Sequence, residues 1–216
     1  MIFPRCSGIL LHITSLPSAH GIGDLGSYAH EFVDFLAESG QRIWQVLPLS
    51  PTGYADSPYQ CFSAYAGNPL LVDLQKLQEQ GRLGSQDLAN APQFGADFVD
   101  YGRVIAFRQT LLRKAAQDFR VNANEADSTA FKTFCKENEA WLDDYALFMA
   151  GKDFHKGVVW TEWDSGLRQR DPSALAHWKQ RLSPEIEMHK FVQFEFFRQW
   201  ESLKSRCRRH GVPLAR

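Results

Sequence analysis

The sequence predicts an α/β fold, and the pattern of its apolar residues indicates it. Residues 8–13 (GILLHI) and 43–47 (IWQVL) are short, nearly continuous apolar runs, which fit strands buried on both faces of a parallel sheet. Between them, apolar residues recur with helical spacing over residues 28–36. A strand, a helix and a second strand in this order form a right-handed βαβ unit, the building block of α/β barrels and doubly wound sheets.

Signals for the ends of these elements are also present. The segment from Ser15 to Gly26 is rich in Gly, Pro and Ser and is expected to be a loop. Ser27 is expected to cap the helix, because its hydroxyl can accept a hydrogen bond from an N–H of the first turn. Gly40 is expected to end the helix in a left-handed conformation, and Pro48 to stop the second strand.

The middle of the chain, about residues 73–183, is predicted to be helical. Two amphipathic stripes support this prediction, the first made of Phe98, Val104, Phe107, Leu111, Leu112, Ala115 and Phe119, the second of Phe131, Phe134, Cys135, Trp141, Leu142, Tyr145 and Phe148. An irregular stretch between residues 151 and 172 contains Trp160 and Trp163. These rings could stack on sugars, but we favour anchors that pin the segment to the helices.

A final helix is predicted to begin at Ser183-Pro184-Glu185, where a cap, a proline and an acidic first turn coincide. Gly211 is expected to end it, and residues 212–214 are expected to begin a third strand. The basic run near its end favours the helix dipole. Its expected buried face consists of Met188, Val192, Phe196, Trp200, Leu203 and Cys207.

This layout resembles the opening of a larger barrel. Two parallel strands do not make a stable sheet alone. A barrel of eight strand–helix units needs about 250 residues, and this chain has 216. The predicted fold is therefore the N-terminal part of a (β/α)8 barrel, with a large helical insertion after its second strand.

Composition excludes several classes of protein. The formal net charge is −1, which argues against a nucleic-acid partner, because such partners require a basic stripe. No run of 18 apolar residues indicates a membrane helix, and the N-terminus lacks the features of a signal peptide, so we expect a cytoplasmic protein. The four cysteines lie far apart and are expected to be reduced thiols, without zinc or a disulfide framework.

The long segment from Pro48 to Pro69 carries the most functional information. It is too long for a plain connector, and such loops are usually functional. Sugars present C–H faces that stack on aromatic rings and hydroxyls that need donors and acceptors, which suits a mixture of tyrosines and short polar side chains. The alternative is a loop whose aromatic rings fold back into its own core. The side chains concerned are Tyr54, Tyr59, Phe62 and Tyr65, with Asp56, Ser57, Gln60 and Asn68.

The carboxylates of the first region do not form a convincing catalytic pair. Retaining glycosyl transfer needs two carboxyl groups about 5–5.5 Å apart. Asp24, Asp34 and Asp73 are expected to be helix caps or solvated charges, and Asp56 to brace its loop.

Two further patterns are given structural interpretations. His12, in the first predicted strand, has no partner at metal-ligand spacing and is expected to be structural or hydrogen-bonded near a site. Residues 21–26 (GIGDLG) match a dinucleotide-binding fingerprint, but no acidic residue closes the second strand to hold a ribose. We therefore disfavour dinucleotide binding.

Three segments resemble one known family. GILLHITSLPSAHGIGDLG and WQVLPLSPTGYADSPYQCFSAYAGNPLLVDL are similar to motifs of the amylomaltase family of 4-α-glucanotransferases, also called disproportionating enzymes. WTEWDSGLRQRDP is similar to the tryptophan segment of that family. The resemblance implies a (β/α)8 barrel with helical insertions, with residues 1–73 and 184–216 beginning the barrel and residues 74–183 inserted.

The resemblance also implies an activity and a set of contacts. The family transfers α-1,4-glucan segments between maltooligosaccharides by a retaining double displacement and uses no cofactor. Tyr59 and Ser57 correspond to substrate contacts, Tyr54 to the glucan groove, and Tyr101 to an outer glucan-binding surface. The catalytic carboxylates of the family come from later strands, so no catalytic residue is expected within residues 1–216. A non-catalytic glucan-binding or interaction remnant is the alternative.

Overall fold

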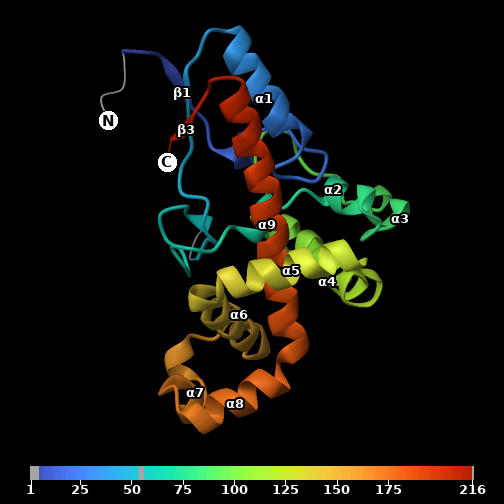
Figure 1. Ribbon diagram of the computed structural model, residues 1–216, viewed down its shortest axis with the longest axis vertical. Helices are drawn as coiled ribbons and strands as arrows, with labels where there is room; N and C mark the ends of the chain where they lie inside the picture. Colours follow the sequence, from blue (N-terminus) through green and yellow to red (C-terminus); the bar gives the residue numbers. More distant parts are fainter. Residues whose placement is uncertain (1–4, 54–55, 216) are drawn as a thin grey trace.

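A single long helix, α9 (Ser183–Arg209), runs through most of the length of the molecule, and the other elements pack around it (Figure 1). The computed structural model describes residues 5–53 and 56–215. A small sheet and helix α1 (Ser27–Glu38) lie at one end of α9, and the short helices α7 and α8 lie at the other (Figure 1).

The sheet is parallel, as the sequence predicts. Its strands are β1 (Gly8–Leu10), β2 (Ile43–Gln45) and β3 (Leu214–Ala215), in that order. Gly8 lies opposite Ile43, and Trp44 lies opposite Leu214. The prediction of two adjacent parallel strands joined through a helix is confirmed, and so is a third strand after the last helix. The chain therefore has an α/β fold with a small parallel sheet.

Strand β1 differs from its prediction in length and burial. It ends at Leu10, and all three of its residues are exposed, so this strand is not buried on both faces. Within the described residues it pairs with β2 alone. The apolar run continues in a 3-10 helix, η1 (Ile13–Ser15), where Ile13 is fully buried. Its apolar character therefore reflects burial of the segment after the strand.

Helix α1 begins one residue earlier than expected, so the prediction of Ser27 as its cap is wrong. Gly26 is the N-cap residue, and no side chain accepts a hydrogen bond from the first turn in the manner of a cap. The carboxylate of Asp24 instead accepts a hydrogen bond from the Gly26 N–H at 3.1 Å. At the other end, Gly40 has a φ of +69°, and the N–H of Gln41 donates to the Leu36 carbonyl, which confirms the predicted C-terminal turn.

The helical middle is confirmed, with different divisions. Its helices are α2 (Leu74–Glu79), α3 (Ser85–Ala89), α4 (Tyr101–Asn122), α5 (Glu125–Glu137), α6 (Glu139–Phe154), α7 (Ser165–Arg168) and α8 (Pro172–Arg181). Phe98 precedes α4 and is exposed, so it does not belong to the first stripe. The second predicted stripe is divided between α5 and α6, because Asn138 separates the two helices.

The core beside the sheet is centred on Trp44. Its ring is fully buried, and its indole N–H donates to the Leu11 carbonyl at 2.8 Å. Val33 and Leu36 of α1 and Leu203 of α9 belong to the same buried cluster. Each fully buried apolar side chain of this size contributes about 1.5–3 kcal/mol, so α1 is held mainly by its inner face.

Helix α9 is buried on more than one face. The six expected positions are at most partly exposed, but buried residues also include His189, Phe191, Gln193, Phe194, Glu195 and Gln199. Leu182 is its N-cap residue, so Ser183 is the first helical residue and not the cap. Gly211 ends the helix with a φ of +64°, as predicted. Burial all round is explained by α1, α4, α5, α6 and α8, which surround it.

Arg206 near the end of α9 does more than favour the helix dipole. Its Nε donates to Asp34 of α1 at 3.0 Å, in an ion pair that joins residues 172 positions apart. The expectation that Asp34 is a helix cap or a solvated charge is therefore wrong. The ion pair lowers the pKa of Asp34 and connects α1 to α9 at the surface.

Two glutamines of α9 hold the end of the long loop, at Gly67, and the start of the segment that follows it, at Asp73. The side-chain amide of Gln193 accepts from the Gly67 N–H at 2.7 Å and donates to the Gly67 carbonyl at 2.9 Å. Gln199 likewise accepts from the Asp73 N–H at 2.7 Å. A Cβ on Gly67 would lie 2.1 Å from the ring of Phe196, so only glycine fits here. We call these paired contacts the glutamine clamp.

Candidate functional site

The aromatic loop, residues 48–69, leaves the carboxyl end of β2 and folds into a narrow hairpin. Thr52 and Cys61 form an antiparallel bridge, and the Gly53 N–H donates to the Gln60 carbonyl at 2.7 Å. Tyr54 lies outside the described residues. Asp56, near the tip, has a φ of +54°, a left-handed conformation that is uncommon for a residue with a side chain.

Tyr59 and Ser57 lie together near this tip. The Tyr59 ring is 73% exposed, and the Ser57 hydroxyl accepts a hydrogen bond from the Tyr59 N–H at 3.4 Å. A pocket of about 380 Å³ adjoins the ring and is lined by Pro48, Leu49, Ser50, Pro58, Tyr59, Cys61 and Ala64. The serine that lines this pocket is Ser50, and Ser57 lies outside the lining, so the pocket offers the exposed Tyr59 ring as a stacking face and Ser50 as a polar partner.

The other aromatic rings of the loop pack against helix α6. The Tyr65 ring stacks on Trp141 with centroids 6.3 Å apart, and the Phe62 ring lies 6.1 Å from Phe148. The ammonium of Lys152 lies 5.1 Å from the centre of the Phe62 ring. The two interpretations of the loop therefore apply to different residues. Phe62 and Tyr65 contact α6 but stay 40% and 70% exposed, while Tyr59 is 73% exposed and has no aromatic partner among the described residues.

Tyr101, the first residue of α4, reaches the loop from another element. Its ring packs beside Ile22 and Val104, and the Thr14 hydroxyl and the Asp56 carboxylate both influence the pKa of its phenol. Burial, followed by the charge of Asp56, raises the pKa of Tyr101, so the phenol is protonated at neutral pH. The structure thus brings Tyr101 to Asp56, the neighbour of Ser57 in the sequence.

His12 connects the first strand to the start of the loop. Its Nδ1 lies 2.7 Å from the Thr14 hydroxyl, and its Nε2 lies 3.4 Å from the Pro48 carbonyl. Burial lowers the pKa of His12, so the ring is neutral at pH 7. Since a carbonyl only accepts, Nε2 carries the proton, and Nδ1 accepts from Thr14. The expectation of a hydrogen-bonded structural histidine is confirmed.

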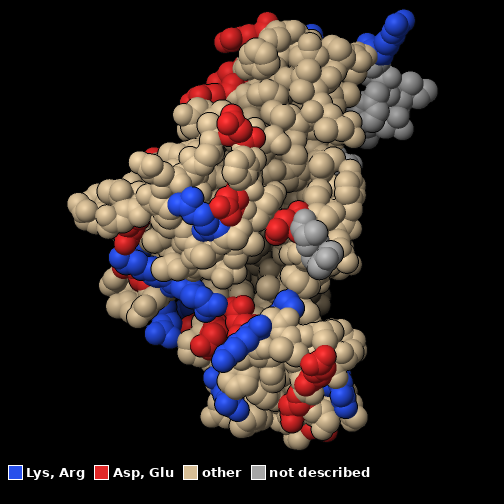
Figure 2. Space-filling model, turned by 180° about the vertical axis from the view of Figure 1, so that it is seen from behind, with Lys and Arg blue, Asp and Glu red and all other residues tan. Residues whose placement is uncertain are grey.

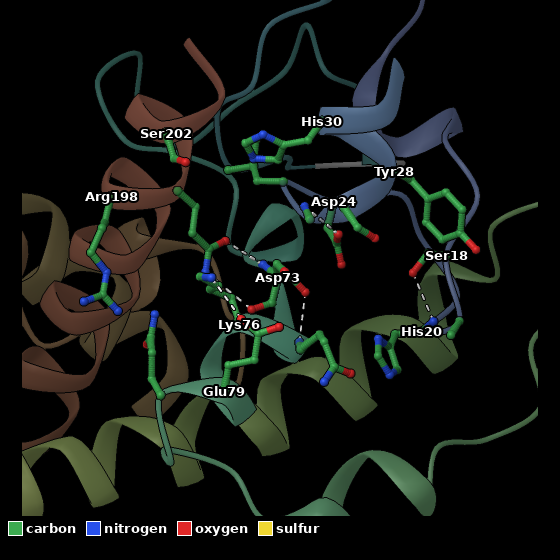
Figure 3. Close-up of a pocket in the computed structure, with 17 residues that line it drawn as sticks. Ser18, His20, Asp24, Tyr28, His30, Asp73, Lys76, Glu79, Arg198 and Ser202 are labelled. Atoms are coloured by element: carbon green, nitrogen blue, oxygen red, sulfur yellow. Dashed lines mark hydrogen bonds and ion pairs between the residues drawn. The ribbon is translucent and has the colours of Figure 1, made fainter. Parts of the chain in front are cut away.

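Asp24 and Asp73 lie close together on the wall of a larger pocket, of about 640 Å³, between α1, α2 and α9 (Figure 3). A Cβ on Gly26 would lie 2.8 Å from one carboxylate and 2.9 Å from the other. Asp24 pairs with the fully buried Arg108 at 3.0 Å. Asp73 is the N-cap of α2, accepting from the Gln75 N–H at 2.9 Å. The expectation of a capping role is therefore confirmed for Asp73, whereas Asp24 is held by an ion pair and is neither a helix cap nor a solvated charge.

The titration of Asp73 reflects this arrangement. Burial, followed by the charge of Asp24, raises the pKa of Asp73 to about 6. Its pKa in the unfolded chain is 3.8, so the stability tied to its protonation is complete below pH 4 and is lost as the pH rises through 6. Asp73→Asn keeps the capping oxygen and removes the buried charge. We expect it to raise the unfolding free energy at pH 7.5 by about 1–3 kcal/mol.

The measurement is urea denaturation of both proteins at several pH values. The advantage of Asp73→Asn should shrink toward zero as the pH falls to 4. Asp171→Asn is the matched control, because Asp171 caps α8 and its pKa is lowered by hydrogen bonds with Ser173 and Ala174. Its substitution should not stabilise the protein at pH 7.5. A constant difference between pH 4 and 7.5 for Asp73→Asn would contradict the explanation.

The glycines of residues 21–26 (GIGDLG) allow close packing, because a side chain at these positions would clash with neighbouring atoms. A Cβ on Gly23 would lie 2.1 Å from the Ile13 carbonyl, and Gly26 has no room beside the two carboxylates. Gly21 has a φ of +83° and lies against the Phe94 ring. Close contacts of the chain with itself explain the motif, so the structure gives no support to a dinucleotide interpretation.

The two tryptophans of the irregular stretch differ in burial, and the cysteines are described with them. Trp163 is buried, and its indole N–H donates to the Val158 carbonyl at 3.0 Å, which confirms its role as an anchor. Trp160 is 49% exposed, so it does not anchor the segment in the same way. The four cysteines, Cys6, Cys61, Cys135 and Cys207, are free thiols, as expected.

The surface and the described side chains limit other kinds of site. Positive and negative side chains are interspersed on the face shown in Figure 2, in keeping with the net charge of −1. Within residues 5–53 and 56–215, no three His, Cys, Asp or Glu side chains gather in a way that could hold a metal ion. None of the helices in this part of the chain is both long and apolar enough to cross a membrane.

Some residues around the loop were not found from the sequence. Thr14 carries no motif signal, yet it lies between His12 and Tyr101. Arg108 lies within an amphipathic helical pattern, where an arginine is ordinarily on the solvent side. The only available signal was the GxGxxG-like segment, whose aspartate, Asp24, is the partner of Arg108.

Comparisons with known proteins agree on one family. The model of the 4-alpha-glucanotransferase family matches residues 11–216. The chain is 47% identical over 214 residues to a 4-alpha-glucanotransferase of Synechocystis sp., and 46% identical over 214 residues to one of Thermus thermophilus. Each match covers 99% of this chain and 42% of the relative. The chain thus spans about two fifths of the length of these relatives.

Solved structures show the same relationship. An amylomaltase from Streptococcus agalactiae, in complex with acarbose, has a TM-score of 0.92 and 39% sequence identity, covering 98% of this chain and 42% of that chain. An amylomaltase from Corynebacterium glutamicum has a TM-score of 0.70 at 16% identity, covering 97% of this chain and 29% of that one. The second similarity concerns the fold alone.

Proposed function

Because the chain belongs to the 4-alpha-glucanotransferase family, we propose that it is part of an enzyme that transfers α-1,4-glucan segments between maltooligosaccharides. One observation carries the proposal for this part of the enzyme. The Tyr59 ring, 73% exposed, stands beside a pocket on a loop that leaves the carboxyl end of a parallel strand. A relative of known structure is a complex with the saccharide analogue acarbose, which is consistent with a sugar ligand.

The proposed architecture is the beginning of a (β/α)8 barrel. Residues 1–73 and 184–216 would form its first strands and helices, and residues 74–183 would be inserted as a helical subdomain. Three parallel strands in sequence order support this arrangement. Barrel active sites lie at the carboxyl ends of the strands, which is where the aromatic loop begins.

The side chains of the loop have distinct proposed roles. Tyr59 offers its ring to the C–H face of a glucose unit, and Ser57 offers a hydroxyl to the sugar rim. Tyr54 is proposed to line the glucan groove, and Tyr101 to contact the glucan further out. His12 is proposed as a positioning residue, because its Nε2 faces the carbonyl of Pro48, at the first residue of the loop.

The proposed mechanism is a retaining double displacement, in which one carboxylate is the nucleophile and another is the acid/base, about 5–5.5 Å apart. The buried or paired carboxylates described above have other partners: Asp24 binds Arg108, Asp73 caps α2, and Asp34 binds Arg206. We therefore propose that the catalytic carboxylates come from residues other than 1–216. No cofactor is required for this chemistry.

Incubation of the 216-residue chain with maltotriose tests whether its own carboxylates can catalyse glucan transfer. We expect no disproportionation into longer and shorter maltooligosaccharides, because no acid/base pair is supplied. Transfer should appear when the chain is part of a polypeptide of the length of its relatives. Transfer by the 216 residues alone, abolished by mutating one of their carboxylates, would overturn the proposal. Absence of transfer in both proteins would favour a non-catalytic glucan-binding remnant.

Tyr59→Ala should weaken glucan transfer more than Phe62→Ala in the polypeptide of full relative length. Loss of a stacked ring costs about 0.5–1.5 kcal/mol, which corresponds to roughly a two- to twelvefold lower kcat/KM. Phe62 contacts Phe148 of α6, so its loss should act mainly on stability. The assay is transfer from maltotriose, compared at equal folded fraction measured by circular dichroism. Equal losses for the two variants would mean that the loop is only structural.

A further inference from the structure

A second aromatic pocket lies between α6, the 3-10 helix η4 (Trp160–Glu162), α7 and α8, near the end of α9 away from the sheet (Figure 1). Its volume is about 300 Å³, at the lower end of the range of roughly 300–1,000 Å³ for ligand pockets. We call it the Trp160 pocket. Besides leucines, it is lined by Phe148, Trp160, Trp163, Asp144, Arg168 and Arg170.

The floor of this pocket is rigid. Trp163 is 6% exposed and stacks on His155, with ring centroids 5.2 Å apart and planes inclined by 15°. A Cβ on Gly151 would lie 3.0 Å from the Trp163 ring, so the ring rests on the backbone of α6. Phe148 lies 5.4 Å from the same ring. A ligand would therefore meet preformed aromatic surface.

Trp160 forms an open wall of the pocket. Its side chain is half exposed, and its indole N–H has no hydrogen-bond acceptor within the described part of the chain. Trp44, Trp141 and Trp163 each donate from the indole to an acceptor in the protein. Trp178 and Trp200 have no such acceptor among the described residues either, but both are buried, so Trp160 is distinguished by its exposure. A large ring left in water with a free donor is suited to an amphipathic ligand that supplies both an apolar face and an acceptor.

The rim of the pocket is polar and carries two guanidinium groups and one carboxylate. Arg170 donates to both carboxylate oxygens of Asp144, at 2.8 and 2.9 Å. Arg168 donates to the Thr161 carbonyl at 2.8 Å. Each guanidinium has five N–H donors, so most of them stay available, and Asp144 can still accept. Adjacent donors and acceptors at a fixed spacing suit neighbouring hydroxyl groups of a neutral ligand.

The conformation of Arg170 is costly for a residue with a side chain. Its φ is +58°, in the left-handed region where glycine is favoured. The ion pair that it forms does not explain this choice, because Asp144 and Arg170 are 56% and 60% exposed and exposed pairs contribute little to stability. Arg170 stands in the turn that ends α7: its N–H donates to the Leu167 carbonyl at 3.2 Å, and the Asp171 N–H donates to the Gly166 carbonyl at 2.9 Å, the pattern that places a left-handed residue after a helix. This turn directs the chain so that Arg170 lines the rim of the pocket.

We propose that the Trp160 pocket is a second binding site for α-glucan chains, with Trp160 as the stacking platform and Arg170 and Asp144 as partners for the sugar hydroxyls. The ligand class rests on the proposed function. Phe148 lines this pocket and also contacts Phe62 of the aromatic loop, 6.1 Å between centroids, so the pocket is linked to the loop through a pair of rings. Holding a long chain at a second point raises its effective concentration at the first.

The test is a titration of the 216-residue chain with maltoheptaose, followed by the indole N–H signals of its six tryptophans in ¹H–¹⁵N NMR spectra. The Trp160 signal, identified by its absence in Trp160→Phe, should move on addition of the sugar. The Tyr59→Ala variant should leave this shift unchanged. A Trp160 signal that does not respond, while signals of residues near Tyr59 do, overturns the second site and leaves the proposed function intact.

Arg170→Gly separates binding from folding. Glycine relieves the left-handed strain, so the melting temperature should stay the same or rise. Loss of the guanidinium should nevertheless raise the Kd for maltoheptaose, read at the Trp160 signal, about tenfold, which corresponds to loss of a charged hydrogen bond. The control for loss of a positive charge is Arg208→Ala, which removes an exposed arginine of α9. A glycine control inside a helix, such as Arg120→Gly, is not suitable, because it would destabilise α4. An unchanged Kd in Arg170→Gly contradicts the proposal.

Two further results would also overturn it. An equal response of Trp160 to cellohexaose, a β-linked glucan, would show that the pocket does not select α-glucans. A shift of the Trp160 signal with protein concentration alone would show that the exposed apolar side chains around it, Val158 and Val159 among them, contact another copy of the chain. No response to maltoheptaose at either site would count against the proposed function as well.

Discussion

Replacing Arg108 with methionine is expected to lower the unfolding free energy by about 3–5 kcal/mol at pH 7. Arg108 is fully buried, pairs with Asp24 at 3.0 Å and donates to the Val72 carbonyl. Its removal leaves the Asp24 carboxylate beside Asp73 with no positive partner, in a site where burial already disfavours charge. Urea denaturation monitored by circular dichroism measures the loss.

Two comparisons identify the cause of this loss. Arg113→Met, on the same helix, removes an exposed arginine that pairs with Asp153, and should cost less than about 1 kcal/mol. Arg108→Met combined with Asp24→Asn should recover part of the loss, because the unpaired charge is gone while an oxygen remains to accept from Gly26. Additive effects of the two substitutions would show that the buried ion pair is not responsible.

The second large effect is expected for Gln193→Leu, which should lower the free energy of unfolding by about 2–4 kcal/mol. Its amide satisfies both the N–H and the carbonyl of Gly67, and each buried polar backbone group left without a partner costs about 1–3 kcal/mol. Leucine has a similar size, so the loss should come from the hydrogen bonds. Thermal and urea unfolding measure it, with Gln117→Leu, on the exposed side of α4, as the control.

Gln193→Glu refines this prediction. Glutamate can still accept from the Gly67 N–H, but it presents an oxygen to the Gly67 carbonyl, where the native amide donates. Stability at neutral pH should therefore fall, and it should recover as the pH is lowered and the carboxyl becomes protonated. A protein that is insensitive to both substitutions would show that the glutamine clamp does not hold the loop.

Local chemistry explains which parts of the fold the sequence predicts. Gly40 and Gly211 end their helices at the expected residues, because a left-handed turn strongly favours glycine whatever surrounds it. Asp73 caps a helix because its oxygen reaches an N–H two residues away. The parallel pairing of β1 with β2 follows from two apolar runs joined by a helix.

Long-range contacts explain what the sequence does not predict. The ion pair of Asp34 with Arg206 joins residues 172 positions apart, and Arg108 with Asp24 joins residues 84 apart. The residues next to these side chains in the sequence do not indicate that the pairs form. Ser27 was a plausible cap, but Asp24 reaches the Gly26 N–H from the preceding loop and the helix begins without a serine cap.

For the candidate site, too, the sequence predicts some features, while others depend on long-range packing. The composition of the aromatic loop indicates a sugar-binding surface, but it does not say which ring is free. Rings of Phe62 and Tyr65 contact rings of α6, more than 70 positions away along the chain, whereas Tyr59 has no aromatic partner among the described residues. The role of Thr14 beside Tyr101 likewise depends on the packing of α4 against the start of the chain.

The glutamine clamp has a consequence for how the protein is made. Gln193 follows Gly67 by 126 residues, and Gln199 follows Asp73 by the same number. At a ribosomal rate of roughly 5–20 residues per second, the segment after the aromatic loop waits about 6–25 s for the helix that fixes it. During that time the loop is a nascent, tyrosine-rich stretch without its brace. Its native shape is therefore acquired late in synthesis, and chaperone contact would be expected at this stage.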